Sequence, residues 1–223
     1  MTINSSWSRS IALTSVLVFI ALFASACDWL GVPKEATTID YCAEYKEQPP
    51  NRSCVKTIRL SISPTFGHVK KADSLYEIEL AYPSMIPWRS LSWQEQSRSQ
   101  KLRIGLYGVS GQTTRDFLPS ELSYANELKR MAPIFGLDQY LWDGWGKRQL
   151  LVPIETSPRL VMDCTRNDSP NDLSGDNPYA CISTSFTSWG LKVTYSHQRA
   201  LIPEWQEVHR KVQSFIASLV VST

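Results

Sequence analysis

The sequence predicts an α+β domain in which a mainly antiparallel sheet packs against a C-terminal amphipathic helix. Short segments with alternating apolar and polar residues recur from residue 55 onward, which is the period of half-buried strands. A hairpin pattern lies near the C-terminus, and a helical pattern follows it. Strands followed by one closing helix, without repeated strand–helix units, favour antiparallel pairing.

The first three strands are expected at 55–63, 75–82 and 101–107. Each places apolar side chains at alternate positions, so one face of each strand is apolar. The stretch 83–100 is expected to be a loop with at most one helical turn, because its two prolines each remove a backbone hydrogen-bond donor.

The middle of the chain predicts a short amphipathic helix over 119–131. Leu122, Ala125, Leu128 and Met131 recur there at helical spacing, which would place them on one face.

Short strands are expected at 150–154 and 159–163. The clearest hairpin follows, with strands at 181–187 and 191–196 joined through the turn 188–190.

A strong helix is predicted over 203–219. Pro203 suits the first helical position, and Glu204 and Glu207 complement the positive end of the helix dipole. One apolar stripe is formed by Trp205, Val208, Val212, Phe215, Ile216 and Leu219. His209 is expected to face away from this stripe.

The N-terminus is similar to the signal peptide of a bacterial lipoprotein. Arg9 precedes an apolar run at 11–23, which is shorter than the roughly 20 residues that cross a bilayer as a helix. The sequence Leu22-Phe23-Ala24-Ser25-Ala26-Cys27 then resembles a lipobox, although that pattern prefers leucine in place of Ala24. The resemblance implies lipid attachment at Cys27. The alternative is an ordinary signal peptide cut at the same Ala-Ser-Ala site.

These features predict a signal peptide at 1–26, a tether at 27–40 and a single periplasm-facing domain at 41–223. Lipid on the N-terminal cysteine would attach the domain to a membrane. Asp28 resembles the residue that retains lipoproteins in the inner membrane of enteric bacteria. Other bacteria sort lipoproteins by other residues, so the choice of membrane stays open.

Five cysteines are present, and setting Cys27 aside leaves an even number, as expected for an oxidising compartment. They form two local groups, which predict the disulfides Cys42–Cys54 and Cys164–Cys181. Each would stabilise the fold by about 3 kcal/mol in a chain-entropy estimate. The alternative is free thiols or a metal site.

Composition and motifs favour a binding protein over an enzyme. The formal net charge is only +2, which does not favour nucleic acid as a partner. The segment 108–111 lacks the glycine that a nucleophile elbow needs at Gln112. His68, His197 and His209 form no metal-binding motif. We therefore expect no metal, cofactor or catalytic residue.

Two segments are candidates for contact with a protein partner. Trp142 and Trp145 lie in a glycine-rich turn, where exposed indoles would supply binding energy, although burial in the core is the alternative. Asp168, Asp172 and Asp176 lie inside the second disulfide loop, which would preorganise them for binding. A solvated insertion or a calcium site is the alternative, although the spacing is not that of an EF-hand.

The overall plan resembles that of immunity lipoproteins that protect bacteria against periplasm-delivered toxins, such as type VI lipase effectors. The shared features are the lipobox, the size, the paired cysteines, the lack of catalytic motifs and the aspartate-rich loop with aromatics. The resemblance implies a partner that is a secreted toxin encoded nearby. It makes Asp168, Asp172, Asp176, Trp142 and Trp145 the contact candidates. An envelope-assembly lipoprotein and an unrecognised envelope enzyme are the alternatives.

Overall fold

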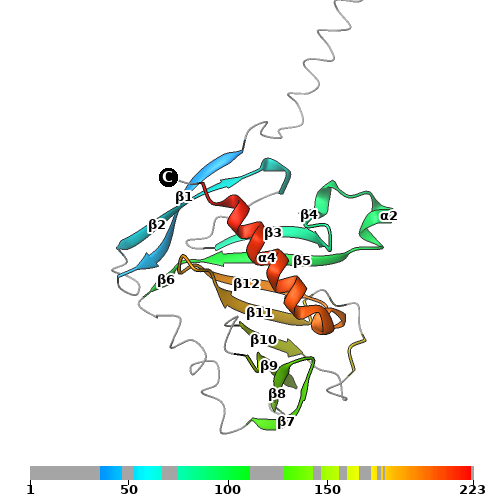
Figure 1. Cartoon of the computed structure of the whole chain (residues 1–223). Helices are drawn as coiled ribbons and strands as arrows, with labels where there is room; N and C mark the ends of the chain where they lie inside the picture. The colour runs from blue at the N-terminus through cyan, green and yellow to red at the C-terminus, as the bar shows by residue number, and fades with distance from the viewer. Residues whose placement is uncertain are drawn as a thin grey trace, which may run out of the picture. The chain divides into compact units, whose positions relative to one another are not determined.

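A computed structural model gives the fold of the chain (Figure 1). The chain divides into two units, Met1–Glu35 and Ala36–Thr223, and the fold below is that of the second. The predicted signal peptide and Cys27 lie outside the described part. The structure describes residues 36–46, 53–66, 75–110, 128–142, 147–155, 160–165, 172–174, 177 and 179–221.

Most of the domain is a nine-stranded sheet with the strand order β4-β3-β5-β12-β11-β10-β9-β8-β7. All of its neighbouring strands pair antiparallel. Its strands are β3 (Leu75–Tyr82), β4 (Ile86–Pro87), β5 (Gln100–Tyr107), β7 (Lys129–Ile134), β8 (Leu137–Trp142), β9 (Arg148–Pro153), β10 (Leu160–Thr165), β11 (Cys181–Phe186) and β12 (Lys192–His197).

A smaller three-stranded sheet has the order β2-β1-β6. Its strands are β1 (Thr37–Tyr45), β2 (Cys54–Ile62) and β6 (Val109–Ser110). β1 pairs antiparallel with β2 and parallel with the short β6. Together with the C-terminal helix, the two sheets confirm the predicted α+β class with mainly antiparallel pairing.

The helix α4 (Trp205–Leu219) packs on one face of the large sheet (Figure 1). It follows the 3-10 helix η4 (Arg199–Glu204), which contains Pro203. The α-helix therefore begins at Trp205, two residues after the predicted start at Pro203. The predicted apolar stripe is largely confirmed. Its buried members are Trp205, Val208, Val212, Ile216 and Leu219.

His209 does not face away from the apolar stripe, so that prediction was wrong. It is buried against the sheet, with its Nδ1 3.3 Å from the hydroxyl of Tyr195. A buried imidazole loses hydration when it is protonated, and burial therefore lowers the pKa of His209 to about 4. The helix thus presents a polar residue to the sheet because the strands supply a polar partner for it.

The core lies between α4 and the sheet and is built from alternate residues of each strand. Adjacent residues across the sheet form one buried row that consists of Ile78, Ile104, Tyr195, Ser183, Met162, Leu151 and Gln139. The same cluster continues into the small sheet through Leu60, which forms a bridge with Val220 after the end of α4. One hydrophobic core therefore serves both sheets.

The stretch 83–100 is, as predicted, a connection with one turn of α-helix, α2 (Trp93–Gln96). The 3-10 turn η2 (Trp88–Ser90) precedes it, and a further 3-10 turn, η1 (Pro64–Phe66), follows β2. The predicted strands of the second half are also confirmed as β9, β10, β11 and β12.

Two predicted boundaries are wrong where the structure describes them. The end of the helix expected at 119–131 is the start of β7, because Lys129, Arg130 and Met131 pair with β8 instead. Residues 119–127 lie outside the described part. The tether expected at 27–40 is too long, since β1 begins at Thr37 and pairs with β2. In both places the segment pairs with the next strand along the chain, β8 for β7 and β2 for β1.

Candidate partner-binding surface

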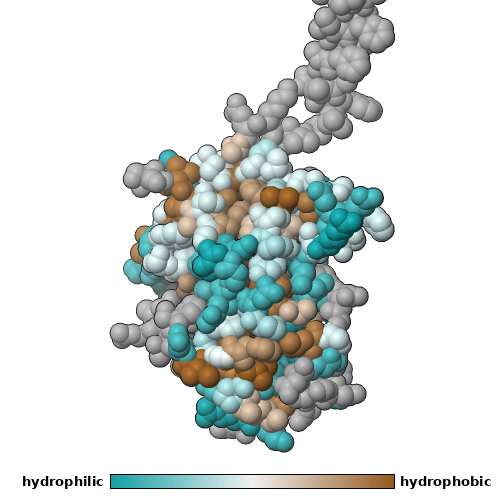
Figure 2. Space-filling view, turned by 45° about the vertical axis from the view of Figure 1, so that its right-hand side comes forward, coloured by the Kyte–Doolittle hydropathy of each residue, from teal (hydrophilic) through white to brown (hydrophobic). Residues whose placement is uncertain are grey.

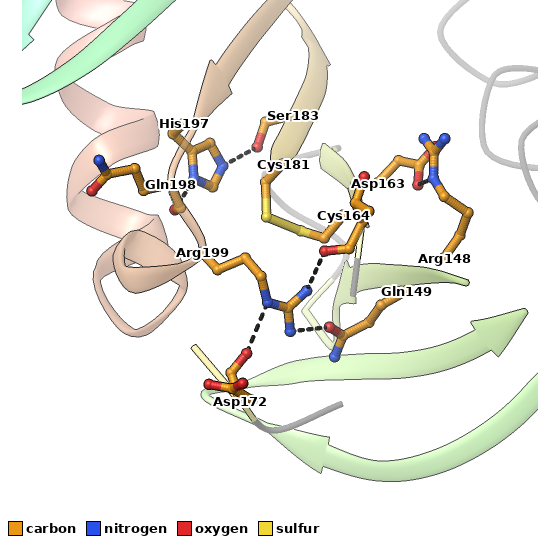
Figure 3. Close-up of a disulfide and its surroundings, with 11 residues drawn as sticks. Arg148, Gln149, Asp163, Cys164, Asp172, Cys181, Ser183, His197, Gln198 and Arg199 are labelled. Carbon is orange, nitrogen blue, oxygen red and sulfur yellow. Dashed lines mark hydrogen bonds and ion pairs between the residues drawn. A yellow bond between two sulfur atoms is a disulfide. The ribbon is translucent and has the colours of Figure 1, made fainter. Parts of the chain in front are cut away.

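Both predicted disulfides are present. Cys164 and Cys181 are directly opposed on β10 and β11, with their Cα atoms 4.0 Å apart, and both are buried (Figure 3). Cys42 and Cys54 join β1 to β2 with a Cα separation of 5.7 Å. The Cys164–Cys181 bridge closes the base of the aspartate-rich connection between β10 and β11.

A single arginine holds the same region together by hydrogen bonds. Arg199 is only 2% exposed. Its Nε donates to the carbonyl of Asp172 (3.0 Å), its Nη1 to the carbonyl of Thr165 (3.1 Å) and its Nη2 to Oε1 of Gln149 (2.6 Å) (Figure 3). One guanidinium therefore connects η4 to the start of β9, the end of β10 and the aspartate-rich connection.

The described parts of this connection are fixed to the domain as well. Leu173 packs against the hydrophobic core. The side-chain oxygen of Asp172 accepts a hydrogen bond from the backbone of Ser174 (2.8 Å), and that of Asn177 accepts one from Tyr179 (3.0 Å). These local turns, the disulfide and Arg199 give the base of the connection a defined geometry before any partner binds.

A serine and a histidine that the sequence analysis did not pair meet on β11 and β12. His197 Nδ1 donates to the carbonyl of Gln198 (2.9 Å), so its Nε2 accepts from the hydroxyl of Ser183 (2.9 Å) (Figure 3). This is the hydrogen bond of a nucleophile and its base. Both side chains are buried, however, and burial lowers the pKa of His197 to about 4. The pair joins two strands inside the core, where substrate has no access.

Trp142 lies at the same end of the sheet as the aspartate-rich connection. It ends β8 and is half-buried, and it pairs with Arg148 at the start of β9. Arg148 in turn forms an ion pair with Asp163 (Nε–Oδ1 2.8 Å) and pairs with Thr165, whose carbonyl binds Arg199. The strand ends thus link Trp142 to the connection that carries Asp172.

The other three contact candidates lie outside the described residues. These are Trp145, Asp168 and Asp176. The structure therefore brings two of the five candidates, Trp142 and Asp172, to neighbouring strand ends. Their contact with a partner stays a prediction.

Exposed apolar side chains lie on several connections between strands of the large sheet. These connections carry five of the eight large hydrophobic residues that are exposed in the described part. We call this set the connection surface, and it consists of Ile86, Trp93, Phe135, Ile154 and Tyr179. Figure 2, which brings the right-hand side of Figure 1 forward, shows brown apolar areas among teal polar ones on this face.

Hydrogen bonds tie three of these connections to the helix. Lys211 Nζ donates to the carbonyl of Pro83 (2.7 Å), and the hydroxyl of Tyr82 donates to Glu204 (2.9 Å), which fixes the connection that carries Ile86 and Trp93. Trp205 Nε1 donates to the carbonyl of Phe135 (2.9 Å). The third connection is the one held by Arg199.

Trp93 is the most exposed member of the connection surface, at 81%. The single turn that carries it is rigidly capped: Ser92 and Glu95 each accept a hydrogen bond from the other's backbone, at 3.3 and 2.8 Å. Gln96 Nε2 also donates to the carbonyls of Trp88 and Leu91. The Ser-x-x-Glu spacing in the sequence is a signal for this turn, but it does not reveal that the indole is exposed.

The described residues contain no group of three or more His, Cys, Asp or Glu side chains placed to hold a metal ion. Within the same residues, no helix has the length and apolar character needed to cross a membrane.

Comparison with known proteins adds the fold relationship. No protein-family model matches the chain, and no curated protein sequence matches it. A solved structure that matches is Smlt3025, an immunity protein of the Stenotrophomonas maltophilia type IV secretion system, with a TM-score of 0.55 and 13% identity. The match covers 85% of this chain and 100% of that chain. The chain therefore shares its α+β fold with a secretion-system immunity protein of very different sequence.

Proposed function

We propose that this chain is an immunity protein that binds a toxic effector and neutralises it on the periplasmic side of a bacterial membrane. The observation that carries the proposal is the fold likeness to Smlt3025, which extends over the whole of that immunity protein. The lipoprotein plan of the sequence supports the same function, because immunity to periplasm-delivered toxins requires an exported protein.

The connection surface supports binding rather than catalysis. A partner that binds preformed connections does not have to order them, so less binding free energy is lost. Arg199, the Cys164–Cys181 disulfide and the capped α2 turn all serve this preorganisation. We propose that contacts come from this surface together with Trp142, Trp145, Asp168, Asp172 and Asp176.

We also propose the location and the attachment. Two disulfides fit an oxidising compartment such as the periplasm. Lipid on Cys27 would hold the domain at the membrane, and Asp28 favours the inner membrane in an enteric host. The sequence plan favours a type VI lipase effector, whereas the fold neighbour belongs to a type IV system. Identification of the partner decides between the two.

The test is an affinity pull-down with the full chain carrying Cys27→Ser, exported to the periplasm. The probes are the proteins encoded by the flanking genes, each made in the same cells. We expect one of them to be recovered in stoichiometric amount, with its toxic activity blocked. Recovery of envelope-assembly machinery instead, or of no flanking-gene product, would contradict the immunity function.

A further inference from the structure

The tip of the β7–β8 hairpin carries an aromatic residue in a backbone conformation that aromatic residues rarely adopt. Ile134 and Leu137 are paired, so the turn between them consists of Phe135 and Gly136 alone. Both have positive φ angles, 51° and 76°. Positive φ at both central residues is what a type I′ turn requires, and Asn-Gly is the sequence that best satisfies it. Phenylalanine in the first position is a steric outlier.

The fold does not explain why phenylalanine occupies this position. The backbone of Phe135 has a structural role, because its carbonyl accepts a hydrogen bond from Nε1 of the core residue Trp205 (2.9 Å). The side chain is 50% exposed and is not among those that pack against the core. Asparagine would make the same backbone contact with less strain. The described fold thus gives the backbone of Phe135 a role and its exposed side chain none, which points to a contact made by that side chain.

A second apolar side chain lies beside it. The backbone N–H of Ile154 donates to the carbonyl of Gly136 (3.1 Å), which places Ile154 next to the turn, and its side chain is 53% exposed. No residue from Ala132 to Leu137 is charged. Phe135 and Ile154 therefore form a protruding apolar tip, which fits a concave and apolar surface on a partner.

Among the described residues, the unpaired charges next to the tip in the structure are negative. Glu155 follows Ile154 and is exposed, and among the described residues it has no ion pair. Glu204 precedes Trp205 and is bound by the hydroxyl of Tyr82 rather than by a cation. The nearest cation on the hairpin, Arg130, is already paired with Asp138 (2.9 Å). Excess negative charge opposes contact with an anionic bilayer and favours a partner with basic side chains.

From these observations we infer that Phe135 inserts into an apolar pocket of the effector protein, and that basic side chains at the rim of this pocket face Glu155 and Glu204. The inference rests on the proposed function, and it names the chemistry of the partner's site. Phe135 would be the residue that carries most of the binding energy, as rigidly held aromatic side chains at the centre of interfaces commonly do.

The experiment compares the full chain carrying Cys27→Ser with the same chain carrying Phe135→Asn as well. Asparagine relieves the backbone strain, so we expect Tm to rise by about 2–4 °C. We expect the affinity for the flanking-gene product recovered in the pull-down to fall by about 30-fold or more. A gain in stability together with a loss of affinity is the signature of a residue kept for binding.

Two further variants serve as controls. Val55→Thr removes an apolar side chain that is 60% exposed on β2, away from the tip, and should leave the affinity unchanged. Glu155→Lys should leave Tm unchanged and slow association with the effector, and added salt should reduce this difference.

The outcomes separate the inference from the proposed function. If no flanking-gene product binds the wild-type domain, the proposed function fails and the inference fails with it. If the partner binds wild type and Phe135→Asn equally well, the inference alone is overturned. It is also overturned if Phe135→Asn lowers Tm, because the side chain would then serve the fold. If Phe135→Asn weakens binding to phosphatidylglycerol vesicles and leaves binding to the effector unchanged, the tip contacts the membrane and the inference is overturned.

Discussion

Replacement of Arg199 by methionine tests whether this buried side chain fixes the connection surface. Methionine fills similar space and removes all of the hydrogen bonds that the guanidinium donates. The carbonyls of Thr165 and Asp172 and the side-chain oxygen of Gln149 would each lose a charged donor. Gln149 is buried, and its Nε2 already has no hydrogen-bond partner among the described residues, so water cannot readily replace the arginine there.

The magnitude follows from these contacts. A lost hydrogen bond to a charged group costs about 1.5–3 kcal/mol when the acceptor stays buried and less when water reaches it. One fully buried acceptor and two partly buried ones therefore predict a loss of about 3–5 kcal/mol in the free energy of unfolding. For a domain of this size this corresponds to a fall in Tm of about 6–20 °C.

Equilibrium unfolding in urea measures the global effect, and limited proteolysis between Thr165 and Cys181 measures the local one. We expect a lower midpoint and faster cleavage in this connection. Arg210→Met is the matched control, since Arg210 forms only an exposed pair with Glu207 and should change the midpoint little. An Arg199→Met protein that unfolds at the wild-type midpoint would show that these hydrogen bonds do not stabilise the domain.

Three further predictions concern the disulfide, pH and Trp93. Replacement of Cys164 and Cys181 by alanine should cost about 3 kcal/mol in urea unfolding, and an unchanged midpoint would contradict the disulfide's role. The pKa of both His197 and His209 is lowered to about 4, so the unfolded chain binds protons first as pH falls from about 6.5 to 4. Stability should fall in that window by up to about 2.7 kcal/mol per pH unit, and a flat profile would argue against neutral buried histidines. Trp93→Ala should leave Tm unchanged and weaken partner binding about tenfold or more, whereas equal affinity would remove Trp93 from the interface.

Local patterns predicted the parts of this fold that local physics determines. Alternating residues in β2, β3 and β5 and the apolar stripe of α4 bury one face each, so their period appears directly in the sequence. The disulfide pairs were predicted because each joins cysteines on strands that are neighbours in both sequence and space.

Two of the strands that were not predicted, β1 and β7, were missed for different reasons. β1 alternates Ile39, Tyr41 and Ala43 with Asp40 and Glu44, so its strand period is present in the sequence although a tether was expected there. β7 (Lys129–Ile134) has no such alternation, and its pairing with β8, the next strand along the chain, makes it a strand. His209 faces the core because Tyr195 offers a polar partner, which no helical period reveals.

The surface residues were the hardest to predict, because their environment depends on distant parts of the chain. Arg199 binds groups on β9, β10 and the aspartate-rich connection, and its burial follows only from the way these parts of the chain converge. The exposure of Trp93 and the positive φ of Phe135 are likewise properties of the folded chain. Among the five contact candidates, only Trp142 and Asp172 lie in the described part.

A protection assay in living cells tests the immunity function itself. Sensitive cells would export the flanking-gene effector, with or without this chain in the periplasm, and their growth would be followed. We expect normal growth with the wild-type chain and arrested growth with a chain that carries both Trp93→Ala and Phe135→Asn, although that chain is folded and present in equal amount. Growth arrest despite the wild-type chain, for every effector candidate encoded beside it, would contradict the immunity function.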